Sequence, residues 1–192
     1  GILEIEHPQK TVVALFTDKE EIGSVGNTGM RSTFFDNTVA ELINLEDQEY
    51  NELYLRRTMA KSKVLSADVN SGRASGGFTF VPRLIHSYIG KGIVIKKFTG
   101  YRGKSEANDA NVEFVGEVKK LLRDNKIVWQ AGELGKVDAG GGDTIAYILA
   151  NKGADVIDCG VPVLNMHAPF EIISKVDLYM AYKAYKAFYI VK

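Results

Sequence analysis

Short apolar runs that alternate with segments of helical periodicity constrain the fold of this chain more than any other feature. The run TVVALF, residues 11–16, is continuous and rich in β-branched side chains, which is typical of a central strand buried on both faces. Four further strands are expected at 63–69, 92–98, 126–132 and 154–160. Strands that alternate with helices predict a three-layer α/β fold, in which a mostly parallel sheet carries helices on both faces.

Helices are expected between these runs because apolar residues recur there at intervals of three and four. The clearest patterns are 109–125 and the closing segment 174–189, which Ser174 can cap and whose Leu and Tyr stripe predicts a core or oligomer contact. The stretch YRGKSEAND, 101–109, is interpreted as a polar loop. The remaining helices are expected at 32–45, 48–62 and 140–153.

Composition argues against several classes of partner. Among the 192 residues, 24 are Lys or Arg and 24 are Asp or Glu, so no net charge attracts nucleic acid or an anionic membrane. No apolar run approaches the roughly 20 residues that cross a bilayer. The one cysteine, Cys159, can form neither an internal disulfide nor a zinc site of paired cysteines. We therefore expect a cytoplasmic protein without a nucleic-acid or membrane partner.

Carboxylates and one imidazole follow the expected strands. Glu20 and Glu21 follow the first strand, Asp68 ends the second, and His167 follows the fifth. Carboxylates with an imidazole and no thiolate suit zinc, manganese or cobalt in a hydrolytic site. Adjacent side chains near a strand end point in different directions, so one glutamate can ligate a metal while the other acts as general base toward its water.

Each of these residues also has a purely structural interpretation. Carboxylates beside a glycine loop commonly solvate a turn, and a histidine such as His167 is commonly a hydrogen-bonded packing residue. His7 and His86 have no such neighbours and are interpreted as surface residues. The segment DAGGGDTI, 138–145, can cradle a phosphate at a helix start, but Asp143 would repel that anion. Close backbone approach near a site is the favoured interpretation.

In this order, the motifs resemble the aspartyl aminopeptidase and aminopeptidase I family of di-zinc exopeptidases. The resemblance lapses only at about 71–90. The matching stretches are LFTDKEEIGSVGNTGMRSTFF, VLSADVN, KGIVIKKFTGYRGK and residues 133–189.

The resemblance implies a role for each candidate residue. Glu20 would be the general base that acts on the metal-bound water, and Glu21 and His167 would ligate one zinc ion. Asp68 would ligate the other zinc ion. Substrate-binding residues are implied at Lys96, Gly141 and Gly142.

The family's first zinc histidine and its metal-bridging aspartate lie upstream of its Glu-Glu motif, and only nineteen residues precede Glu20 here. Residues 1–192 are therefore expected to be a partial catalytic domain without the amino-terminal portion and the inserted oligomerisation domain. The expected function is removal of amino-terminal residues from peptides by a homo-oligomer, a dodecamer in the family. The complete subunit would hold two zinc ions, with cobalt or manganese as alternatives.

Two other functions stay open from the sequence. One is a related glutamyl or deblocking aminopeptidase, against which the segments KVDAGGGDTI and MHAPFE argue. The other is a catalytically incomplete fragment that acts as an assembly or interaction module. The preference for acidic or neutral amino-terminal residues is not determined by these motifs.

Overall fold

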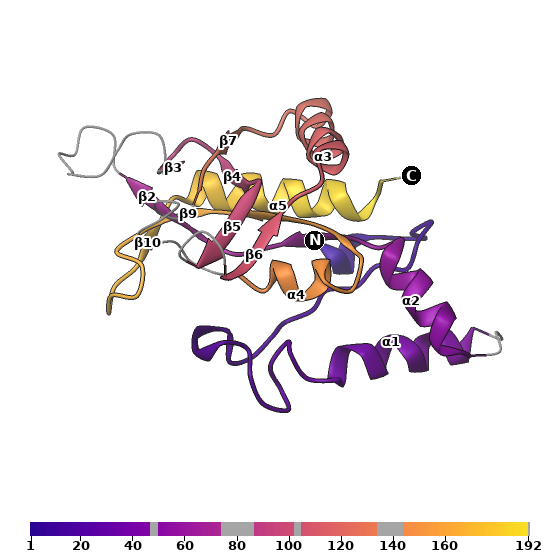
Figure 1. Cartoon of the computed structure of the whole chain (residues 1–192). Coiled ribbons are helices and arrows are strands. Elements are labelled where there is room, and N and C mark those ends of the chain that lie inside the picture. The colour runs from indigo at the N-terminus through magenta and orange to yellow at the C-terminus, as the bar shows by residue number, and fades with distance from the viewer. Residues whose placement is uncertain (47–49, 74–86, 102–104, 134–143, 192) are drawn as a thin grey trace.

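A four-stranded sheet in the order β1-β8-β4-β7 lies at the centre of the structure, a computed structural model (Figure 1). The structure describes residues 1–46, 50–73, 87–101, 105–133 and 144–191. In the central sheet, β8 pairs in parallel with β1 and antiparallel with β4, and β4 pairs in parallel with β7. The four strands are β1 (Lys63–Ser66), β4 (Ile93–Lys96), β7 (Trp129–Ala131) and β8 (Asp155–Gly160).

A second sheet and a hairpin complete the described strands. The second sheet has the order β10-β9-β2-β3, and β5 pairs antiparallel with β6. Four of the seven strand pairings in the described residues are parallel, so the predicted α/β fold with a mostly parallel sheet is confirmed. These strands are β2 (Asn70–Arg73), β3 (Ser87–Tyr88), β5 (Phe98–Tyr101), β6 (Ser105–Asp109), β9 (Pro162–Leu164) and β10 (Ile172–Ile173).

Helices cover both faces of the central sheet. In Figure 1, α3 and α5 lie on one side of it, and α4 lies on the other side with α1 and α2. The predicted cap at Ser174 is confirmed, because its hydroxyl accepts a hydrogen bond from the Val176 amide at 3.2 Å. The helices are α1 (Phe34–Leu45), α2 (Glu52–Ala60), α3 (Val112–Asp124), α4 (Ala146–Ala150) and α5 (Lys175–Tyr189), with 3-10 turns η1 (Ile2–Glu4) and η2 (Glu20–Ile22). No helix in the described part of the chain is long and apolar enough to span a membrane.

The two faces of β8 pack against two separate hydrophobic cores. Ile157 and Cys159 pack with α3 and α5, whereas Val156 packs with α1, α2 and α4. The alanines of α5 form much of its core face: Ala181, Ala184 and Ala187 are buried, and Tyr185 packs against the same core. Small side chains let the helix approach the sheet closely, and Leu178 and Tyr182 of the predicted stripe are exposed.

Two predicted elements are wrong. Residues 11–16 form no strand, and the side chain of Phe16 is 95% exposed, because no described strand pairs with this apolar run. The stretch 101–109, interpreted as a polar loop, instead contributes to the β5–β6 hairpin. Asn108 of this hairpin is buried and its side-chain amide donates to the Val156 carbonyl at 3.1 Å, so a polar residue here serves the fold.

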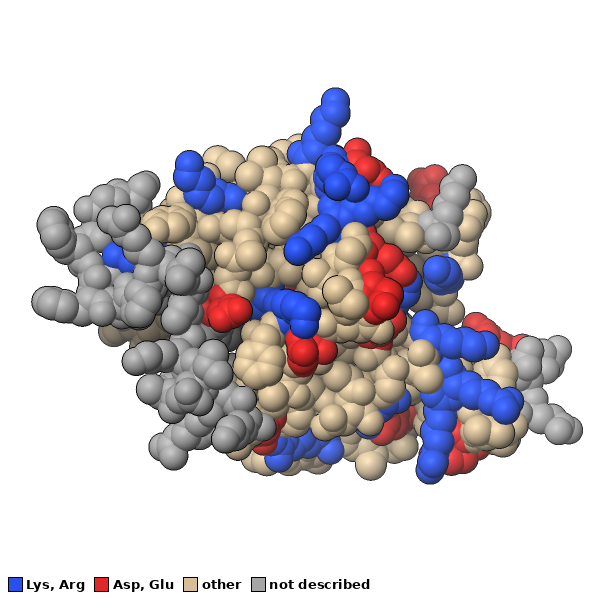
Figure 2. Space-filling model, turned by 45° about the horizontal axis from the view of Figure 1, so that its top comes forward, with Lys and Arg blue, Asp and Glu red and all other residues tan. Residues whose placement is uncertain are grey.

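Charged side chains of both signs are interspersed over the face in Figure 2, where Asp and Glu lie between the Lys and Arg clusters. This face carries no broad field of one sign.

Candidate metal centre

Glu20 and Glu21 lie on a tight 3-10 turn, η2, directly after the extended apolar run. The turn is flanked by Lys19 and Gly23, which both adopt left-handed backbone conformations with φ of 61° and 89°. The Gly23 amide donates to the Glu20 carbonyl at 2.9 Å, and the Ser24 amide donates to the Lys19 carbonyl at 2.8 Å. This backbone geometry presents two adjacent carboxylates, of which Glu20 is half-buried and Glu21 is 73% exposed.

The glycine-rich loop after η2 folds back on itself and is closed by hydrogen bonds. The Thr28 hydroxyl donates to the Asp18 carboxylate at 2.8 Å, and the Arg31 amide donates to the Ser24 carbonyl at 3.1 Å. A Cβ atom on Gly29 would lie 2.2 Å from that same Ser24 carbonyl oxygen, so only glycine fits there. Gly29 is thus required by backbone packing.

Arg31 fastens the closed loop to the rest of the domain. Its guanidinium donates to the Tyr147 hydroxyl on α4, with an Nε distance of 3.0 Å, and it forms an ion pair with Glu106 on β6. The neighbouring Met30 is buried in the core formed with α1, α2 and α4. The carboxylates of η2 therefore stand on a loop with defined anchors at one end.

His167 lies in the turn after β9 and faces Glu21. The imidazole Nδ1 is 3.7 Å from Glu21 Oε2, and the His167 side chain is 66% exposed. The backbone of His167 is left-handed, with φ of 64°, a conformation that is uncommon for residues other than glycine. The His167 amide donates to the Glu171 carboxylate at 2.6 Å, which holds this turn in place.

The Glu21–His167 pair fits part of a zinc site. Metal–ligand distances near 2.1 Å let two donor atoms 3.7 Å apart share one ion, and a carboxylate with an imidazole is a common zinc donor set. Within the ranges that the structure describes, no group of three or more His, Cys, Asp or Glu side chains is arranged to hold a metal ion. The described residues thus supply two donors at this position and no third.

Asp68 lies in the link between β1 and β2, where its backbone crosses close to β8. A Cβ atom on Gly160 would lie 1.8 Å from the Asp68 carbonyl oxygen, so glycine is required at the end of β8. The Asp68 side chain remains 33% exposed. Asp68 is therefore held by its backbone while its carboxylate stays accessible.

A row of three buried polar side chains lies beneath Asp68. In the sheet register, Asp158 of β8 is opposite Ser66 of β1 on one side and opposite Lys96 of β4 on the other. Residues directly opposite each other on neighbouring strands share a face, so the three side chains form one line. From that line, Lys96 Nζ donates to the Val69 carbonyl at 3.1 Å and lies 3.6 Å from Asp68 Oδ2.

Asp158 is completely buried, and its carboxylate contacts Thr144, which precedes α4. The Thr144 hydroxyl donates to Asp158 Oδ2 at 3.2 Å and accepts from the Ala146 amide at 3.2 Å, at the start of α4. Burial raises the pKa of the Asp158 carboxyl, and the positive charge of Lys96 opposes that rise.

The predicted site residues thus fall into two groups. Glu20, Glu21 and His167 belong to the first, and Asp68 and Lys96 belong to the second. Gly141 and Gly142 lie outside the described residues, as does His86, and their roles stay predictions. His7 is exposed, as expected.

Three residues near the site were missed in the sequence. Glu171 and Thr144 act through hydrogen bonds to a backbone amide and a buried carboxylate, and no motif marks such contacts. Asp158 does carry a signal, because a carboxylate inside the apolar strand VIDCG is seldom buried without a partner.

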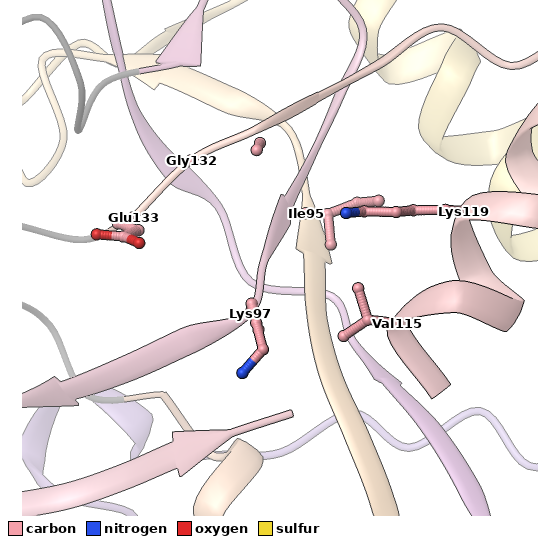
Figure 3. A pocket seen from close by; sticks show the side chains of 7 residues that line it. Ile95, Lys97, Val115, Lys119, Gly132 and Glu133 are labelled. Carbon is pink, nitrogen blue, oxygen red and sulfur yellow. The ribbon is translucent and has the colours of Figure 1, made fainter. Parts of the chain in front are cut away.

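The other face of β4 borders a small cavity that contains none of the predicted site residues. Its volume is about 140 Å³, and in Figure 3 Lys119 of α3 extends toward Ile95 across it. Lys97 and Glu133 also line this cavity, and Lys97 forms an ion pair with Asp109. Lys96, the last residue of β4, and Lys97, which follows it, therefore lie on opposite sides of the sheet.

Comparison with known proteins gives the chain a family. Residues 3–189 match the model of the aminopeptidase I zinc metalloprotease (M18) family. A probable M18 family aminopeptidase 1 from Clostridium acetobutylicum is 49% identical over 188 residues, covering 98% of this chain and 40% of the relative. A protein of the same description from Thermotoga maritima is 41% identical over 182 residues, covering 94% of this chain and 40% of the relative.

Solved structures agree with this match. The crystal structure of aminopeptidase I from Clostridium acetobutylicum superposes with a TM-score of 0.83 at 47% identity, covering 98% of this chain and 40% of that one. An M18 family aminopeptidase from Thermotoga maritima gives a TM-score of 0.83 at 40% identity, covering 90% and 38% of the two chains. The chain spans about 40% of the length of the curated relatives it matches.

Proposed function

The chain belongs to the aminopeptidase I zinc metalloprotease (M18) family, and on that premise we propose that it is the carboxyl-terminal part of the catalytic domain of a metal-dependent aminopeptidase. The observation that carries the proposal is the approach of His167 Nδ1 to Glu21 Oε2, 3.7 Å apart, on the turn that also presents Glu20. A general base next to a pair of zinc donors is the arrangement that hydrolysis requires.

In this proposal, two zinc ions bind per complete subunit, with cobalt or manganese as alternatives. Glu21 and His167 would hold one ion, and Asp68 would hold the other. Bound zinc lowers the pKa of a water ligand toward neutrality and polarises a carbonyl group. The remaining ligands would come from outside the described residues, because these residues contain no larger donor group.

Glu20 has the role of proton carrier in this reaction. Its carboxylate would accept a proton from the attacking water and deliver it to the amine that leaves the cleaved peptide bond. Glu20 is half-buried and directly precedes the proposed ligand Glu21 on η2. The substrate class that we propose from the family match is peptides with a free amino terminus, cleaved one residue at a time.

The proposal extends to the state of the protein in the cell. We propose a cytoplasmic homo-oligomer: the single cysteine, Cys159, is buried and unpaired, which fits a reducing compartment. A solved structure of a Saccharomyces cerevisiae relative, 22% identical, is described as a dodecamer. Val176, Leu178 and Tyr179 of α5 are exposed apolar residues that suit contact with another subunit. Light scattering of the purified protein tests the oligomeric state.

Zinc content and peptide cleavage test the function together. The complete subunit with the wild-type sequence is expected to bind zinc and to release free amino acids from a peptide, and Glu20→Gln in that subunit is expected to retain zinc while turnover falls at least about 100-fold. Glu41→Gln, an exposed glutamate on α1, is the matched control and should retain activity. Wild-type turnover in Glu20→Gln would remove the assigned base. A complete subunit that binds no zinc would instead support the alternative of an assembly or interaction module.

A further inference from the structure

We propose that Asp18 and Thr28 are positioning residues for Glu20, because the hydrogen bond between them closes the neck of the loop that presents this glutamate. The neck consists of Asp18 and Gly29, which form a β-bridge at the two ends of the loop 18–29. The inference rests on the proposed function, since Glu20 is the general base of that reaction. It assigns no substrate contact to either positioning residue.

The first observation is that the ends of the loop 18–29 lie side by side. The β-bridge between Asp18 and Gly29 is parallel, and the Thr28 hydroxyl donates to Asp18 Oδ2 at 2.8 Å. A backbone contact and a side-chain contact therefore close the same neck. Compact surface loops whose ends lie close together frequently carry function.

The second observation is that the turn with Glu20 depends on the neck and not on hydrophobic packing. The turn η2 begins two residues after Asp18, and none of its residues is buried. Between them lies Lys19, whose carbonyl accepts hydrogen bonds from the Ile22 and Ser24 amides at 3.3 and 2.8 Å. The position of the turn therefore follows the backbone at Asp18.

The third observation is that the other side of the neck is fixed to the domain. A Cβ atom on Gly29 would lie 2.2 Å from the Ser24 carbonyl oxygen, and the next residue, Met30, is 3% exposed. Thr28 thus stands beside a fixed backbone, and its hydrogen bond holds Asp18 against it. Both of these side chains are exposed, so the bond can be removed without opening the core.

Release of the neck should affect the chemical step. A general base acts only within hydrogen-bond reach of the proton that it removes, and a misplacement of about 1 Å can lower a rate about 100-fold. With the neck open, Glu20 stands on a turn that no buried residue anchors. We therefore expect a loss of kcat, with little change in KM or in the stability of the core.

The test compares Thr28→Val with Thr28→Ser in the complete subunit. Valine keeps the shape of threonine without the hydroxyl, so kcat for a peptide should fall about 10-fold or more while KM and zinc content stay at the wild-type values. Serine keeps the donor and should restore the wild-type kcat. Thr38→Val is the matched control, because it removes an exposed hydroxyl that donates to the Phe34 carbonyl at 2.8 Å on α1, and its kcat should not change.

Amide hydrogen exchange reports on the loop independently of activity. In Thr28→Val, the Gly23 and Ser24 amides, whose hydrogen bonds close the turn, should exchange faster, while the amides of α3 exchange as in wild type. Asp18→Ala should give the same pattern. The double variant should lose no more kcat than Asp18→Ala alone, because both changes remove one bond. If Thr28→Val does not fold, Thr28→Ala replaces it.

The outcomes that overturn the inference are distinct. Wild-type kcat in Thr28→Val overturns it, as does a reduced kcat with unchanged exchange at Gly23 and Ser24. A Thr28→Ser variant as slow as Thr28→Val, or additive losses in the double variant, also overturns it. Loss of zinc in Asp18→Ala alone does so in favour of a metal ligand. A wild-type complete subunit that cleaves no peptide overturns the proposed function and the inference with it.

Discussion

Asp158 on β8 lies directly opposite Lys96 on β4, and both side chains are fully buried. Each member has a further contact: the hydroxyl of Thr144, which precedes α4, donates to Asp158, and Lys96 Nζ lies 3.6 Å from Asp68 Oδ2. A charged pair in an apolar interior is weak support for stability by itself, but removal of one member leaves the other without compensation. This asymmetry makes the pair a sensitive test of the structure.

Removal of the Asp158 carboxylate should destabilise the protein strongly. Asp158→Ala is expected to lower the free energy of unfolding by about 3–5 kcal/mol, because the Lys96 charge loses a buried partner. Asp158→Asn should cost less, since it keeps an acceptor for the Thr144 hydroxyl. Urea denaturation measures both, and Asp124→Ala, an exposed acid at the end of α3, should behave as wild type. Wild-type stability of Asp158→Ala would contradict the buried pair.

Two glycines should respond in opposite directions to the same substitution. Gly160→Ala places a Cβ atom 1.8 Å from the Asp68 carbonyl and is expected to destabilise the fold by about 1–3 kcal/mol or more. Gly116→Ala, in α3 with nothing within 4 Å, should stabilise it by about 0.5–1 kcal/mol. Thermal melts of the two variants check the pair. Equal effects would mean that Asp68 does not cross β8 as described.

The contact between η1 and α5 should weaken at acid pH. Hydrogen bonds from Lys186 and Tyr182 lower the pKa of Glu4 from 4.5 to about 2. Because the pKa is lower in the folded state, the stabilising effect is present above pH 4.5 and is lost as the pH falls toward 2. Glu4→Gln should remove this pH dependence, with a small loss of stability at pH 7.

The measurement is the difference in thermal stability between wild type and Glu4→Gln across this pH range. The difference should shrink as the pH falls. Glu6→Gln, another exposed glutamate near η1, serves as the control and should track wild type. A difference that stays constant down to pH 2 would show that Glu4 is not paired.

Much of the central sheet could be predicted from the sequence because buried strands and amphipathic helices leave local patterns. Strands expected at 63–69, 92–98, 126–132 and 154–160 are confirmed as β1, β4, β7 and β8, although each is shorter than expected. The run at 11–16 has the same local pattern and forms no strand in the described structure, because pairing depends on a neighbour that the pattern does not name. The relative direction of paired strands cannot be predicted from the local pattern for the same reason: β4 and β8 pair antiparallel.

Part of the candidate site could also be predicted from the sequence, and part could not. The proximity of Glu21 and His167 follows from a resemblance that covers both motifs, and the structure brings these two side chains to 3.7 Å. The Lys96–Asp158 register could not be predicted, since it depends on which strands pair and in which direction. Local spacing identifies residues that could ligate a metal or transfer a proton. The pairing of strands in the fold decides which of these side chains come into contact.

Anomalous diffraction at the zinc absorption edge, from crystals of the zinc-loaded protein, tests the central claim most directly. The account predicts one zinc peak at about 2.0–2.2 Å from both a Glu21 carboxylate oxygen and a His167 imidazole nitrogen, and a second peak at a similar distance from the Asp68 carboxylate. A zinc ion bound away from all three side chains would contradict it.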